Sequence, residues 1–90
     1  MITEALDALA AAGVSLSRGV IEQRQDGNPD GALLDAIRHL DEQKISLTNE
    51  ALQAVRAGAE QLAFNPRTNL RTLLDQALER IEQRSASSAA

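Results

Sequence analysis

The sequence predicts an all-α fold, a small antiparallel bundle of three or four helices. It contains 16 alanines and 13 leucines in 90 residues, and both residue types favour helices. Valine, isoleucine and threonine, which suit strands, are sparse. Apolar residues recur at spacings of three and four, the period of one helix face. The length is that of one domain, which we place at residues 1–84, followed by a disordered tail at residues 85–90.

The first predicted segment covers about residues 2–25. Large residues lie on one face, and a parallel row of small residues would let a neighbouring helix approach closely. The large row consists of Ile2, Leu6, Leu9, Leu16 and Val20, and Gly13 occupies the position between Leu9 and Leu16 in the same spacing. Its unbroken period favours one helix of about seven turns. The alternative is two shorter helices, the first ended by Gly13 and the second capped by Ser15 or Ser17.

The second predicted segment begins after Asp26 and Gly27. Asn28 suits the N-cap position, and Pro29 suits the first helical position because proline lacks the N–H that would be unpaired there. Thr48 offers another N-cap further on, yet the apolar period continues past it. We therefore expect two helices joined by a short turn within residues 30–64, with one long bent helix as the alternative.

The last predicted helix starts at Asn65-Pro66, the second Asn-Pro pair in the chain. We expect it to end near Arg84, where basic residues favour the C-terminal dipole. Residues 85–90 are all serine or alanine, and a segment without large apolar residues is predicted to be disordered. Beyond the two Asn-Pro pairs we recognise no internal repeat.

Composition excludes several classes of protein. The chain has no cysteine, which rules out disulfides and thiolate metal sites. Its formal charge of −4 counts against a dedicated binder of nucleic acid or of anionic membranes. No apolar run is long enough to cross a bilayer, and no signal-peptide pattern is present, so we expect a cytoplasmic protein.

Candidate reactive groups are few. His39, the only histidine, shares a helix face with Asp35 and Glu42, an arrangement that in outline could hold a metal ion or transfer a proton. One helix face does not enclose a site, and no nucleophile motif or phosphate loop is present. We therefore expect no enzyme, no metal and no cofactor. Arg67 and Arg71 oppose the dipole of the last helix, for which solvation or ion pairing with Glu60 or Asp75 accounts. An acidic partner surface or a bound phosphate is the alternative.

Regular apolar rows without reactive groups predict a non-catalytic interaction module, such as a small adaptor, a chaperone-like protein or a regulatory subunit. Its partner would be another protein or a second copy of the chain, and we expect a homo-oligomer. The alternative is that each row is buried in the core of the chain itself. The predicted contact residues are Leu6, Leu9, Leu16, Val20, Leu70, Leu74 and Ile81.

The second predicted function is DNA binding by a helix-turn-helix motif at residues 5–24. The turn would lie at residues 12–15, and Arg18 and Arg24 would then face the DNA. Gly19 in the middle of the recognition helix counts against this interpretation, as do the nearby acidic residues Glu22 and Asp26.

Overall fold

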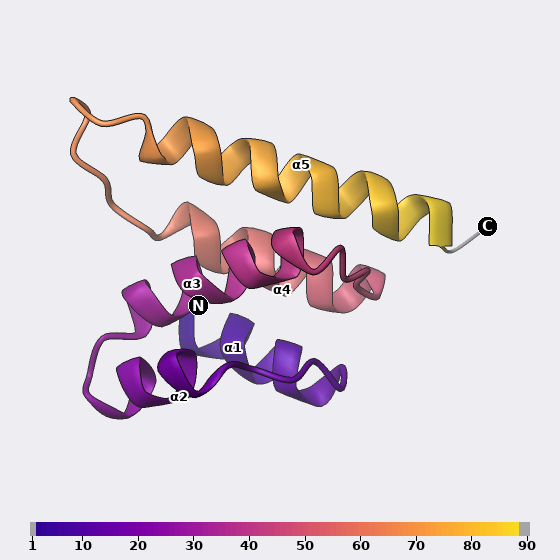
Figure 1. The fold of residues 1–90 in the computed structure, drawn as a ribbon, viewed down its shortest axis with the longest axis horizontal. Coiled ribbons are helices and arrows are strands. Elements are labelled where there is room, and N and C mark those ends of the chain that lie inside the picture. Colours follow the sequence, from indigo (N-terminus) through magenta and orange to yellow (C-terminus); the bar gives the residue numbers. More distant parts are fainter. Residues whose placement is uncertain (1, 89–90) are drawn as a thin grey trace.

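The computed structural model describes the backbone of residues 2–88 and the side chains of residues 2–86. This part of the chain is all-helical and contains no strand, which confirms the predicted class (Figure 1). Its five helices are α1 (Ile2–Ala11), α2 (Arg18–Gln25), α3 (Pro29–Glu42), α4 (Asn49–Glu60) and α5 (Leu70–Ser88). The expected number of three or four helices is therefore wrong. None of the helices described combines the length and the apolar character needed to span a bilayer.

The first segment forms two helices, so the prediction of one continuous helix over residues 2–25 is wrong. Gly13 has a φ of 83°, a left-handed conformation that ends α1. The N–H of Val14 donates to the carbonyl oxygen of Leu9 at 3.1 Å, the bond that closes a Schellman motif. The Ser17 hydroxyl then accepts from the N–H of Val20 at 3.3 Å and caps α2. The helix end at Gly13 and the cap at Ser17 therefore outweigh the regular spacing of the apolar residues.

Two helices also form within residues 30–64, as predicted. Lys44 ends α3 in the left-handed region with a φ of 54°, and the N–H of Ile45 donates to the Leu40 carbonyl oxygen at 2.9 Å. The Thr48 hydroxyl caps α4 by accepting from the N–H of Ala51 at 3.2 Å.

The hairpins α1–α2 and α3–α4 share one backbone design, a repeat that sequence inspection missed. The cap residues Ser17 and Thr48 have the same φ of −65°, with ψ values of 156° and 158°. In each hairpin a left-handed residue stands four positions before the cap. The two loop sequences are Gly13-Val14-Ser15-Leu16-Ser17 and Lys44-Ile45-Ser46-Leu47-Thr48. Two of the five aligned positions are identical, two are conservative replacements, and the left-handed position differs most, with glycine in one loop and lysine in the other.

Each hairpin packs its helices on those of the other hairpin. Helix α1 lies against α4, α2 lies against α3, and α1 meets α3 at the centre. Figure 1 shows α2 and α3 toward the viewer, with α1 and α4 behind them. A twofold axis relating the hairpins would produce this arrangement, in which neither hairpin buries its apolar face without the other. The largest fully buried side chains are Leu6, Leu9, Val20, Leu33, Ile37, Leu40, Val55 and Ile81.

Helix α5 covers only the second hairpin and packs mainly on α3. Its predicted start at Asn65-Pro66 is wrong, because the Asn65 carboxamide accepts from the N–H of Arg67 at 3.0 Å and forms a turn instead. Its predicted end near Arg84 is also wrong, since the helix continues to Ser88. Ser85, expected in a disordered tail, is buried. Residues 89–90 of that predicted tail lie outside the described residues.

Candidate protein-docking groove

The seven predicted contact residues fall into two groups in the structure. Five of them lie in the core of the chain, each at most 3 % exposed: Leu6, Leu9, Val20, Leu74 and Ile81. Leu16 is half-buried, and only Leu70, at 41 %, is exposed. Because Leu16 also packs against this core, the alternative interpretation, in which the apolar rows form the internal core, describes six of the seven. Whether any of them binds a partner remains a prediction.

Two exposed leucines lie together at the beginning of α5. Leu70 is 41 % exposed and Leu73 is 48 % exposed, and Ile21 on α2 is the other large apolar side chain exposed among the described residues. Leu73 was not among the predicted contact residues. Its sequence signal is weak, because Leu73 and Leu74 are adjacent and only the position of α5 on α3 shows which of them is buried.

Leu70 and Leu73 line a groove of about 340 Å³ between α3 and α5. The two helices run side by side in the same direction (Figure 1). Residues one turn apart on each helix form the walls and floor. Helix α3 contributes Leu34, Arg38, Asp41 and Glu42, and α5 contributes Leu70, Leu73, Leu74, Ala77 and Arg80. The result is a leucine- and alanine-lined channel with charged groups along its α3 side and at one end.

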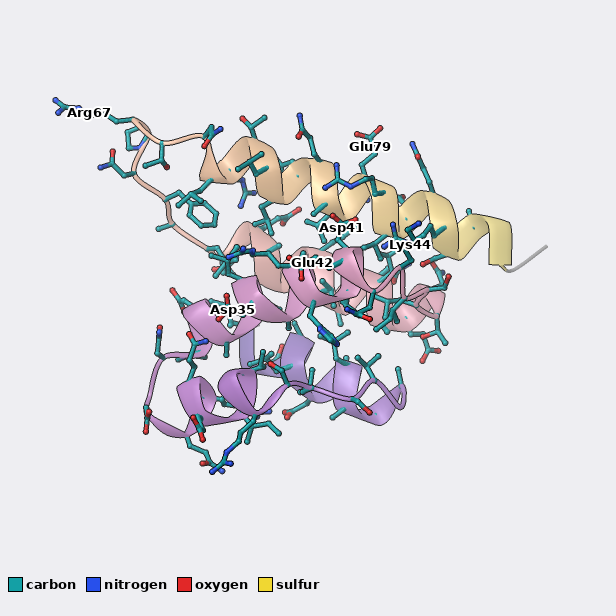
Figure 2. The ribbon with its side chains drawn as sticks, in the orientation of Figure 1. Asp35, Asp41, Glu42, Lys44, Arg67 and Glu79 are labelled. Atoms are coloured by element: carbon teal, nitrogen blue, oxygen red, sulfur yellow. The ribbon has the colours of Figure 1, made fainter. Side chains whose placement is uncertain are left out.

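A network of ion pairs closes one end of the groove. Arg80 binds Asp41 with both prongs of its guanidinium, Nη2 to Oδ2 at 2.7 Å and Nε to Oδ1 at 3.0 Å. Arg84 adds a contact to Asp41 Oδ1 at 3.4 Å and donates to the Leu40 carbonyl oxygen at 3.2 Å. Figure 2 places Asp41 between α3 and α5. These bonds join the two walls and hold α5 against α3 at this end of the groove.

The same network shifts two pKa values. Hydrogen bonding from Arg80 lowers the pKa of Asp41, partly opposed by burial, and Arg84 adds to the lowering. The hydrogen bond to Asp41 in turn raises the pKa of Arg80. Both shifts favour the charged forms, because each ion stabilises the other.

Two further charges line the groove without such partners. Arg38 and Glu42 are exposed, and within the part of the chain that the structure describes neither forms an ion pair. They lie one turn apart on α3. Both charged groups are therefore available to a molecule in the groove.

The arginines of the predicted helix-turn-helix form ion pairs within the chain. The Arg18 Nε lies 2.9 Å from Glu22 Oε1, and the Arg24 Nη1 lies 2.7 Å from Asp7 Oδ1. DNA phosphates would have to compete with these carboxylates. DNA binding by residues 5–24 remains a prediction.

The residues around His39 have separate contacts. Asp35 accepts a hydrogen bond from the Gln23 carboxamide and so ties α3 to α2, whereas Glu42 lines the groove. Figure 2 shows Asp35 and Glu42 at different positions along α3. Over residues 2–86, no three side chains of histidine, cysteine, aspartate or glutamate gather in a group that could hold a metal ion.

Arg71 stabilises the end of a neighbouring helix. Its Nη1 donates to the carbonyl oxygen of Ala59 at 2.8 Å, at the C-terminus of α4. There a cation complements the helix dipole. The predicted local pair with Asp75 is also present, with a separation of 3.7 Å. Arg67, by contrast, lies in the turn before α5 and projects away from the bundle (Figure 2).

Comparison with known proteins assigns this chain to no family. No protein-family model, curated protein or solved structure matches it.

Proposed function

We propose that this protein is a non-catalytic interaction module, an adaptor or regulatory subunit, that binds an amphipathic helix of another protein in the groove between α3 and α5. The observation that carries this proposal is the exposure of Leu70 and Leu73, 41 % and 48 %, at the edge of a groove of about 340 Å³. Covering exposed leucine side chains in an apolar groove is favourable, at about 25 cal/mol per Å² of apolar area.

A helix is the shape that suits this groove. Two parallel helices leave a channel between their exposed faces, into which a third helix can set a row of side chains. On the α5 wall the apolar lining residues Leu70, Leu73 and Ala77 recur at one-turn intervals, and Leu34 adds one apolar side chain from α3. A partner helix with leucine or isoleucine every three or four residues would match them. Because few large side chains contribute, we expect dissociation constants roughly in the micromolar range.

The proposal is tested by selecting binders from a displayed library of amphipathic helical peptides and mapping them by NMR on the isotopically labelled chain. Selected peptides should carry leucine or isoleucine at one-turn intervals and should shift the amide signals of residues 34–42 and 70–80. Leu73→Asp should abolish binding while circular dichroism stays unchanged.

The matched control is Ile21→Asp, which places the same charge on an equally exposed apolar residue, 45 % against 48 %, on α2. It should leave binding intact. The proposal fails if no peptide is selected, if the peptides shift amides elsewhere, or if both variants weaken binding alike. A chain that is dimeric in sedimentation and monomeric as Leu73→Asp would show that a second copy occupies the groove instead.

A further inference from the structure

We infer that Arg38 and Glu42 set the direction in which a partner helix lies in the groove, an inference that rests on the proposed function. The two side chains have opposite charge and lie one turn apart on the α3 wall, about 6 Å along the helix axis. The remaining lining charges, Asp41 and Arg80, neutralise each other. The groove therefore presents one basic and one acidic group in a defined order.

The separation of these two charges contrasts with another pair in the same chain. Arg18 and Glu22 have the same Arg-x3-Glu spacing on α2 and form an ion pair at 2.9 Å. Arg38 and Glu42 do not form one over the described residues. Both side chains are exposed and line the groove, so their charges are accessible to a partner there.

Charge complementarity then specifies the partner. Beside its apolar row the partner helix should carry an acidic residue opposite Arg38 and a basic residue opposite Glu42. A helix with the order Glu-x3-Arg satisfies both contacts when it runs parallel to α3. A helix with the order Arg-x3-Glu satisfies them only when it runs antiparallel. Charges at the edge of an interface act on orientation and association more than on affinity.

The test uses two synthetic amphipathic peptides of equal composition, one with Glu-x3-Arg and one with Arg-x3-Glu beside the same leucine row. Each carries a nitroxide label at its N-terminus, which broadens the amide signals of nearby residues. The label of the Glu-x3-Arg peptide should broaden residues 30–35, and that of the Arg-x3-Glu peptide should broaden residues 42–46. We expect each peptide to favour its orientation about tenfold, since two weak attractions replace two repulsions.

The protein variant with both Arg38→Glu and Glu42→Arg should reverse the broadening pattern of each peptide. The matched control exchanges the charges of the other Arg-x3-Glu pair, Arg18→Glu with Glu22→Arg, and should leave the pattern unchanged. About 0.5 M NaCl should remove the orientation preference and retain binding, because salt screens exposed charges but not apolar contact.

The outcomes separate this inference from the proposed function. If neither peptide binds, and library selection also yields no binder, the groove is not a docking site and both fail. A different outcome is that the peptides bind with the same broadening for both, or with broadening that the variant Arg38→Glu with Glu42→Arg does not change. Either result retains the groove as a docking site and overturns the role of Arg38 and Glu42.

Discussion

The hydroxyl of Ser85 in α5 accepts a hydrogen bond from the backbone N–H of Leu47 at 2.9 Å and donates one to the Ile81 carbonyl oxygen at 2.7 Å. Ser85 is buried, so this contact joins the last turns of α5 to the loop between α3 and α4 away from water. Residues 85–88, serine and alanine for which the sequence predicts disorder, therefore belong to a helix.

Ser85→Ala should lower the free energy of unfolding by about 1–3 kcal/mol, because it leaves the buried N–H of Leu47 without an acceptor. Urea denaturation followed by circular dichroism measures the change. Ser15→Ala is the control, since Ser15 is exposed in the equivalent loop of the first hairpin and should change stability little. Equal stability of Ser85→Ala and the parent chain would contradict the buried contact.

The ion pairs of Asp41 should make the stability of the fold depend on pH in the acid range. Its folded pKa lies below its ordinary value of 3.8, mainly because Arg80 hydrogen-bonds the carboxylate. As pH falls, the unfolded chain takes up this proton first. The stabilisation is therefore fully present above about pH 4 and is lost as pH falls through the folded pKa.

Asp41→Asn should remove that part of the acid dependence and lower stability at neutral pH by about 1 kcal/mol, a modest value because Arg80 is half-exposed. Urea denaturation at a series of pH values checks both effects. Asp26→Asn, at an exposed position, serves as the control. An unchanged slope of stability against pH below pH 4 in the Asp41 variant would refute the assignment.

Substitutions at the equivalent positions 13 and 44 should change the free energy of unfolding in opposite directions. Lys44→Gly should raise stability by about 0.5–1 kcal/mol, because lysine at a φ of 54° is strained and glycine is not. Gly13→Ala should lower it by about 1 kcal/mol, although nothing lies within 4 Å of the added methyl group. Thermal unfolding of both variants provides the measurement. Two shifts in the same direction would show that backbone conformation is not the cause.

Neighbouring leucines of α5 should differ sharply in their effect on stability. Leu74 is 3 % exposed and Leu73 is 48 % exposed. Leu74→Ala should lower the free energy of unfolding by about 2–4 kcal/mol, because it leaves a cavity in the core. Leu73→Ala should lower it by less than about 1 kcal/mol. Denaturant unfolding checks this. Similar losses for the two variants would mean that α5 packs on α3 through a different face.

Much of the helical framework follows from residues close together in the chain. Helix-forming composition makes the chain all-α, and Asn28 with Pro29 begins α3 because cap and first-turn chemistry act within a few residues. The two-helix arrangement of residues 30–64 is predictable for the same reason, since Thr48 caps α4 locally. The error at Asn65 is local as well: its side chain bonds the N–H two residues on and favours a turn over a helix start.

Contacts between distant segments account for the other features that the sequence did not predict. Ser85 is ordered by Leu47, which no pattern within the last residues can reveal. Leu33 and Leu34 are adjacent and chemically identical, yet Leu33 is buried and Leu34 lines the groove. An apolar row shows that a helix has an inner face, but how much of that face its neighbours cover depends on where they pack. The groove exists because α5 covers only part of α3.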